Sequence, residues 1–318
     1  MSSSDGSPPP RSDAPVGAPR TAAPRRRSRK GLFLSYAMIA LPFLMLFVFA
    51  IYPFIQGLAK AFFNYNGGDI DIFIGVDNFV RILTDTQFHQ SLLNALILTA
   101  FAVLVSTVIP LWVAWMVHHF TSERLKYLFR ILVMLPTIVP MAVSLLIWSR
   151  LLSVDGVLNT VLGAVGLGDL AHNWLGDQSV VLLGIMLVGL PWLGGVNCLL
   201  YLGAFGNVPP ELYEAAELDG GKRWTVFRMV EYPFVAMQTK IIVMLGIIGG
   251  LQAYENIYIL TKGGPNDASM VPGLILFRNA FSYGQYGYAS AIGATILILT
   301  LIILGAFQLV GALRRRRG

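Results

Sequence analysis

Six long stretches of apolar residues recur along the chain, and they constrain its fold more than any other feature. Each has about 20 or more residues, the length that a helix needs to cross the hydrocarbon core of a bilayer. Only 13% of the residues are charged, whereas a soluble domain carries about a quarter. The sequence therefore predicts an all-α membrane protein with six transmembrane helices. The expected spans are residues 34–59, 91–117, 127–152, 179–205, 235–260 and 287–312.

Lysine and arginine are distributed unevenly between the segments that separate these spans. The segments on the side of the N-terminus hold 17 of them, and the segments on the opposite side hold 3. Cytoplasmic loops carry such an excess, so both termini are expected in the cytoplasm. Residues 1–30 have the composition of a disordered basic cytoplasmic tail, and residues 31–318 are expected to form one transmembrane domain. The net charge of +6 thus reflects membrane topology and does not indicate a nucleic-acid partner.

No recognisable set of catalytic or metal-binding residues occurs in the sequence. It has no phosphate-binding glycine loop of the Walker type, no Ser-His-acid set and no pair of histidines spaced to hold a metal. Cys198 is the single cysteine, which excludes an intrachain disulfide. His118 and His119 fall at the cytoplasmic end of the second span, where we expect them to be solvated. We therefore predict no catalytic residue, no metal site and no cofactor bound by this chain.

The fifth expected span differs from the others because it contains polar side chains. Gln252, Glu255 and Asn256 are spaced so that they share one face of a continuous helix, and Tyr254 and Tyr258 lie beside them. A carboxylate in a span is costly and marks a functional site by default. Amide, carboxylate and phenol groups together suit a polyhydroxylated ligand. The alternative is a polar helix end near the outer headgroups.

Asn197 in the fourth span is a weaker candidate for the same ligand. It is a polar residue among Gly, Val and Leu. Its alternative role is a hydrogen bond to a neighbouring helix. The candidates for the substrate pathway are therefore Asn197, Gln252, Tyr254, Glu255, Asn256 and Tyr258.

The polar segment 211–233 between the fourth and fifth spans has the pattern of two short helices. Acidic residues and helix formers come first, Gly220 and Gly221 interrupt them, and a second amphipathic turn ends at Pro233. On the predicted topology this helix pair is cytoplasmic. The alternative is an ordinary cytoplasmic loop that only connects two spans, and the composition of the segment alone would favour it.

Two motifs in these segments resemble those of a known family. Glu214-Ala215-Ala216, Gly220 and the Val230-x-Tyr232-Pro233 end are similar to the cytoplasmic EAA signature of ABC importer permeases, with Val and Tyr in place of the usual Ile and Leu. Asp219-Gly220 matches the carbohydrate branch, except that Gly221 replaces an alanine. The segment 258–265 looks like the Tyr-x-Leu-Thr-x-Gly-Gly-Pro motif of sugar permeases. The chain thus resembles the carbohydrate-uptake permeases, which include the maltose and glycerol-phosphate permeases.

The resemblance implies a bacterial cytoplasmic-membrane complex. Its parts would be this chain, a second homologous permease subunit, two ATPase subunits that bind ATP and Mg, and an extracytoplasmic substrate-binding protein. The EAA helices would dock on an ATPase: Glu214 and Asp219 would meet basic groups, Ala215 and Ala216 would allow close approach, and Gly220 would form the bend. The substrate would be a sugar or oligosaccharide, with a polyol or sugar phosphate left open.

Two other classes of protein remain as alternatives. A secondary transporter should carry paired membrane-embedded ionisable residues and usually internal repeats. Glu255 is the only clear candidate here, and the six spans show no obvious repeat. An intramembrane enzyme would need a catalytic pairing that the sequence does not show.

Overall fold

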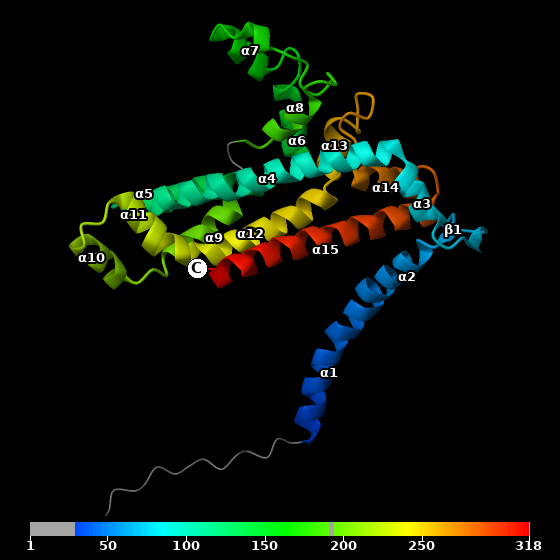
Figure 1. Cartoon of the computed structure of the whole chain (residues 1–318), viewed down its shortest axis with the longest axis horizontal. Helices are drawn as coiled ribbons and strands as arrows, with labels where there is room; N and C mark the ends of the chain where they lie inside the picture. Colours follow the sequence, from blue (N-terminus) through cyan, green and yellow to red (C-terminus); the bar gives the residue numbers. More distant parts are fainter. Residues whose placement is uncertain (1–28, 191–193, 318) are drawn as a thin grey trace, which may run out of the picture. The chain divides into compact units, whose positions relative to one another are not determined.

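A computed structural model describes residues 29–190 and 194–317 of the chain (Figure 1). The chain divides into two compact units, residues 1–54 and 55–318. The described part of the first unit is helical throughout, with α1 (Arg29–Leu46), the π-helical turn η1 (Phe47–Ile51) and the start of α2 (Tyr52–Lys60). The expected tail, residues 1–30, lies almost entirely outside the described residues.

Both π-helical turns of the chain's described part stand directly before a Tyr-Pro pair. η1 precedes Tyr52-Pro53, and η4 (Phe227–Glu231) precedes Tyr232-Pro233. Proline has no N–H to donate, and its ring collides with the carbonyl four residues earlier. A wider turn ahead of the proline relieves that collision while the helix continues. The helix therefore runs through both prolines without ending.

The segment between the first two expected spans contains the strands. β1 (Phe63–Tyr65) and β2 (Asp71–Phe73) pair antiparallel, with Phe63 opposite Phe73. α3 (Asp77–Thr84) follows. The all-α prediction therefore holds for the described chain except at this small hairpin.

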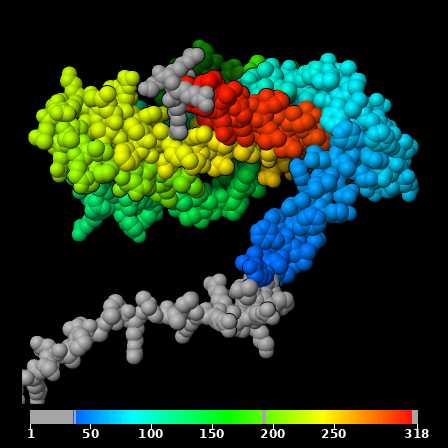
Figure 2. Space-filling model, turned by 60° about the horizontal axis from the view of Figure 1, so that its bottom comes forward, coloured from blue at the N-terminus to red at the C-terminus, as the bar shows by residue number. Residues whose placement is uncertain are grey.

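Three long helices of the second unit lie side by side (Figures 1 and 2). They are α4 (Thr86–His118), α12 (Tyr232–Gln252) and α15 (Tyr286–Arg317), and the shorter α9 (Gly195–Phe205) packs against α4 and α12. A helix rises about 1.5 Å per residue, so α4 alone is about 50 Å long. These helices form the frame on which the shorter elements are placed.

The shorter elements occupy the connections between the long helices. They are α5 (Glu123–Met134), η2 (Leu135–Ile138), α6 (Met141–Leu151), α7 (Val157–Ala164), η3 (Gly168–Leu170), α8 (Val181–Leu187), α10 (Pro210–Leu218), α11 (Arg223–Val226), α13 (Glu255–Leu260) and α14 (Pro272–Phe281). α10 and α11 form one end of the second unit (Figure 1).

Four helices in the described residues are long and apolar enough to cross a membrane: 38–60, 86–118, 223–252 and 286–313. The number is five if 123–138 and 141–151 count as one span, but these two pieces are bent by 91° at the break between Ile138 and Met141. The fourth expected span, 179–205, consists of shorter pieces, α8 and α9, with 191–193 outside the described residues. A multi-pass helical membrane protein is thus supported, whereas six unbroken spans are not confirmed.

Two clusters of buried apolar side chains stabilise the second unit. One joins the first half of α4, including Phe88 and Ala95, to α14 and α15. The other joins the second half of α4, including Ala114 and Val117, to α9 and α12. Because α4 contributes to both clusters, it connects the two ends of the unit.

Candidate functional site

In the segment 210–231, the short helix α10 is followed by a glycine bend and by α11, which continues through η4 into α12. The expected pair of two short helices is thus one short helix and the start of a long one. Gly220 has a φ of +68°, which an L-residue rarely adopts and which glycine adopts without strain. Its N–H donates to the carbonyl of Glu217 at 3.0 Å, and the N–H of Gly221 donates to the carbonyl of Ala216 at 2.8 Å. These two bonds form a Schellman motif, which satisfies the last carbonyls of α10. Gly220 therefore ends α10 and sets the direction of the chain into α11.

α10 presents the residues of the Glu-Ala-Ala pattern on the surface. Glu214, Ala215 and Asp219 are exposed, and Ala216 is half-buried. Leu218, the last residue of α10, is 89% exposed, an unusual position for a large apolar side chain beside a charged face. Leu218 was not among the residues that the sequence predicted for docking.

Behind α10 lies a cluster of half-buried side chains around one buried carboxylate, which the sequence analysis missed. We call it the Glu231 cluster; it consists of Trp115, His118, His119, Tyr213 and Glu231. The Glu231 side chain is 1% exposed. Its carboxylate accepts hydrogen bonds from Trp115 Nε1 at 2.7 Å and from the Tyr213 hydroxyl at 3.2 Å, and it pairs with His119 Nε2 at 3.0 Å. The acidic residue beside a span was visible in the sequence, but its partners were not.

His119 is held between two hydrogen-bond acceptors. Nε2 faces the carboxylate of Glu231, and Nδ1 lies 2.9 Å from the carbonyl of Trp115 at the end of α4. Only the protonated imidazole donates from both nitrogens. The hydrogen bond to Glu231 accordingly raises the pKa of His119 above its ordinary value. The expectation that His118 and His119 are simply solvated is wrong, since both rings are half-buried.

Tyr213 connects the cluster to α10. Its hydroxyl donates to Glu231 and also lies 3.3 Å from His118 Nε2. The rings of Tyr213 and His118 are stacked. Burial, together with the nearby carboxylate, raises the pKa of Tyr213, so the hydroxyl keeps its proton and can donate. The Arg223 guanidinium covers the ring of Trp115 at 4.6 Å, which places α11 against the same cluster.

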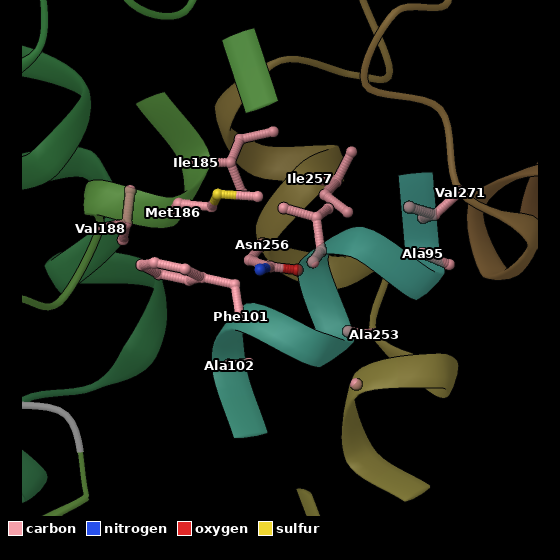
Figure 3. A pocket seen from close by; sticks show the side chains of 12 residues that line it. Ala95, Phe101, Ala102, Ile185, Met186, Val188, Ala253, Asn256, Ile257 and Val271 are labelled. Atoms are coloured by element: carbon pink, nitrogen blue, oxygen red, sulfur yellow. The ribbon is translucent and has the colours of Figure 1, made fainter. Parts of the chain in front are cut away.

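A second candidate site is a pocket of 160 Å³ at the junction of α4, α8, α12 and α13 (Figure 3). Its walls are apolar and include Phe101, Met186, Val188 and Ile257. Among the described lining residues, Asn256 has the one polar side chain, and its amide lies in the middle of the others in Figure 3. Asn256 Oδ1 is buried without a hydrogen-bond partner. An unpartnered buried acceptor in a pocket is available to a ligand hydroxyl.

The expected polar face of the fifth span is interrupted. α12 ends at Gln252 and α13 begins at Glu255, so these residues and Asn256 do not share the face of one continuous helix. Gly273 packs against this break: a Cβ there would lie 3.2 Å from Tyr254 Cβ and 3.4 Å from the carbonyl oxygen of Gln252. The expectation of one helix through 235–260 is therefore wrong at residues 253 and 254.

The other candidate pathway residues are spread around that break. Gln252, Glu255 and Tyr258 are exposed, while Tyr254 stacks on Phe277 of α14 at 5.4 Å between ring centroids. Asn197 Nδ2 donates to the carbonyl of Ser106 on α4 at 3.0 Å. That bond is the neighbouring-helix role that the sequence left open. Of the six candidates, Asn256 is the one that lines the pocket.

The segment 258–265 comprises the end of α13 and the compact loop that follows it. The Thr261 hydroxyl lies 2.7 Å from the Ser269 hydroxyl, and Ser269 also donates to the carbonyl of Gly264 at 2.7 Å. Gly263 has a φ of +81°, and a Cβ there would lie 2.7 Å from Met270 Cε. The threonine and glycine of this motif therefore hold the loop's shape. In the part of the chain that the structure describes, no three His, Cys, Asp or Glu side chains are grouped to hold a metal.

Comparisons with known proteins show which family the chain belongs to. The model of the family "Binding-protein-dependent transport system inner membrane component" matches residues 106–317. The chain is 30% identical over 268 residues to the probable ABC transporter permease protein YurN of Bacillus subtilis, covering 84% of this chain and 92% of YurN. It is 31% identical over 316 residues to the diacetylchitobiose uptake system permease protein NgcF of Streptomyces coelicolor, covering 94% and 88%.

A solved structure also resembles the fold. A chain of a bacterial alginate ABC transporter, in complex with an alginate pentasaccharide-bound periplasmic protein, superposes with a TM-score of 0.76 and 25% identity. The match covers 86% of this chain and 92% of that one. With the family match over two thirds of its length, the chain belongs to the binding-protein-dependent transport system inner membrane components, the family of ABC transporter permease subunits.

Proposed function

We propose that the chain imports a sugar or oligosaccharide across the bacterial cytoplasmic membrane, driven by ATP that a partner ATPase hydrolyses with Mg. The names of relatives support the substrate class: NgcF serves diacetylchitobiose uptake, and other relatives serve multiple-sugar, lactose and arabinooligosaccharide transport. The 258–265 motif supports the same class. The complex would contain a second homologous permease subunit, two ATPase subunits and an extracytoplasmic binding protein.

The observation that carries the proposal is the exposed helix α10. A helix of this length is not stable alone and normally buries an apolar face. α10 instead has no buried residue and displays Glu214, Asp219 and Leu218 on its surface. Carboxylates around an exposed leucine suit a partner cleft with an apolar floor and a basic rim. The ATPase subunit would supply that cleft, and the bend at Gly220 would fix the angle of entry.

The topology of the proposal follows from the basic residues. α10 and both termini would face the cytoplasm, where the ATPase lies, because Lys and Arg concentrate in these segments. The pocket at the break between α12 and α13 would then lie along the translocation pathway. Asn256 Oδ1 would accept a hydrogen bond from a sugar hydroxyl, and Phe101 would offer a ring face to the apolar side of the sugar.

Uptake measurements in cells test the proposal. A strain lacking this chain should lose uptake of radiolabelled di- and oligosaccharides, and the wild-type chain should restore it. We expect uptake to need intracellular ATP and to persist when the proton gradient is collapsed. Uptake that follows the proton gradient and continues without ATP would show a secondary transporter instead.

A matched pair of variants tests the docking surface. Leu218→Glu places a charge where an apolar contact is proposed, so the ATPase subunit should no longer co-purify with the complex. Leu83→Glu is the control, because Leu83 on α3 is also strongly exposed and is not part of α10. Equal recovery of the ATPase with both variants would contradict docking on α10.

A further inference from the structure

One side chain of α10 makes polar contacts with the rest of the unit. α10 has no buried residue. Among the described residues, Tyr213 is the single side chain of α10 with a hydrogen bond or ion pair to another element. Tyr213 therefore provides the side-chain route by which a displacement of α10 can reach the long helices.

Tyr213 contacts a carboxylate that three elements share. Glu231 of η4 accepts hydrogen bonds from Trp115 Nε1 of α4 and from the Tyr213 hydroxyl of α10. It also pairs with Nε2 of His119, which directly follows α4. Residues 223–252 form one continuous helix, so Glu231 moves with α12. Leaving a buried carboxylate without one of its donors costs much free energy. Trp115, Tyr213 and His119 should therefore move together with Glu231 rather than separate from it.

α4 and α12 also line the pocket, at positions away from the Glu231 cluster. α4 contributes Phe101 and Ala102, and α12 contributes Gly250 close to its end at Gln252. A displacement of α4 and α12 that begins at the Glu231 cluster would therefore also move these walls of the pocket. This is a physical connection between two distant sites through packed, hydrogen-bonded elements.

We propose that Glu231 is a positioning residue that, through Tyr213, transmits displacement of α10 to α4 and α12. The inference rests on the proposed docking of an ATPase on α10. It goes beyond that proposal, because it assigns the transmission to one buried carboxylate and one hydroxyl. The role of Glu231 is to keep the three elements in register while the ATPase moves α10.

Tyr213→Phe tests this with the smallest possible change. It removes the hydroxyl of Tyr213 and leaves Trp115 and His119 bound to Glu231. Tyr201→Phe is the matched control: the Tyr201 hydroxyl also donates to a side chain of another helix, Thr239 Oγ1 at 3.1 Å, and Tyr201 is not part of the Glu231 cluster. The readout is the number of ATP molecules hydrolysed per sugar molecule transported by the assembled transporter in proteoliposomes.

In Tyr213→Phe we expect normal co-purification of the ATPase, continued ATP hydrolysis and a rise of about tenfold in ATP consumed per sugar, since a bond to a charged group is lost. Glu231→Gln should have the same effect, and Tyr201→Phe should not. An unchanged ratio in Tyr213→Phe would overturn the proposal, as would loss of the ATPase, which would place Tyr213 in docking itself. ATP-independent uptake by the wild type would refute the proposed function instead.

Discussion

Thr99 of α4 lies directly against Gly250 of α12. A Cβ added at Gly250 would be 2.6 Å from Thr99 Oγ1 and 2.7 Å from Thr99 Cγ2. One turn earlier, a Cβ at Gly246 would be 2.9 Å from the Val103 side chain. Two glycines four residues apart thus allow α4 and α12 to approach closely, as small residues do between membrane helices.

Gly250→Ala should separate these helices and destabilise the protein by about 1–3 kcal/mol, because the added methyl overfills a tight contact. Thermal unfolding of the purified protein measures the effect. Gly249→Ala is the control, because a Cβ at the adjacent Gly249 meets nothing within 4 Å. Equal melting temperatures for the two variants would show that the α4–α12 contact is not tight in the folded protein.

The apolar pattern predicted some of these elements closely and failed at others. The expected spans 91–117 and 287–312 agree with α4 and α15, because long apolar runs without internal competition leave the helix as the one stable state. The bend near Pro136 and Pro140 was open to prediction, since proline breaks helices. The break after Gln252 was not, because Gly273, from a later element, packs against it.

Some residues of the candidate site were likewise predictable from the sequence, and others were not. Gly220 was assigned to a bend from local residue chemistry, and its positive φ shows the conformation that this chemistry favours. Asn256 was identified as a polar residue in an apolar segment, and it lines the pocket. Glu231 and His119 were not recognised as partners, because residues so far apart in the sequence meet only through the packing of α4 against α12.

Gly220→Val should abolish substrate-stimulated ATP hydrolysis by the assembled transporter while leaving membrane insertion intact. Nothing lies within 4 Å of the added Cβ, so the effect arises from the backbone alone. A β-branched residue in the left-handed region is strained by about 1–3 kcal/mol, which opens the bend between α10 and α11.

Gly220→Asn is the matched control for that change. Asparagine tolerates the left-handed conformation better than other residues and should keep most of the stimulated activity. Loss of activity in both variants to the same extent would mean that the bend requires the absence of a side chain, not a particular φ.

The pairing of His119 with Glu231 predicts a pH dependence of stability. The pKa of His119 is raised above 6.5, chiefly by its hydrogen bond to Glu231, although burial and the nearby Arg223 act in the opposite direction. A raised pKa means that the folded protein holds the proton more tightly than the unfolded chain. The stabilisation is thus complete below about pH 6.5 and is lost as the pH rises through the higher folded-state value.

The melting temperature of the wild-type protein should accordingly fall as the pH rises above about 6.5, whereas His119→Gln should show less of this fall. His89→Gln is the control, because it removes an exposed histidine of α4 that is not part of the Glu231 cluster. Parallel profiles for His119→Gln and the wild type would exclude the protonated pair.

Asn256→Leu separates a ligand contact from a structural role. The Asn256 Oδ1 atom is buried without a partner, and such an atom makes the folded state less stable. A leucine of similar size should leave the melting temperature unchanged or raise it. If a substrate hydroxyl binds this atom, sugar uptake should nevertheless fall by about tenfold or more, because a pocket that hydrogen-bonds its ligand depends on that bond.

Asn94→Leu is the comparison for a buried asparagine that has partners. Its Nδ2 donates to the carbonyls of Ala268 and Met270 at 3.0 and 2.9 Å, so the leucine would leave both acceptors without a donor. We expect destabilisation of about 1–3 kcal/mol per orphaned group. Asn94→Leu should thus lower the melting temperature, whereas Asn256→Leu should lower transport alone. Unchanged uptake in Asn256→Leu would remove this pocket from the substrate pathway.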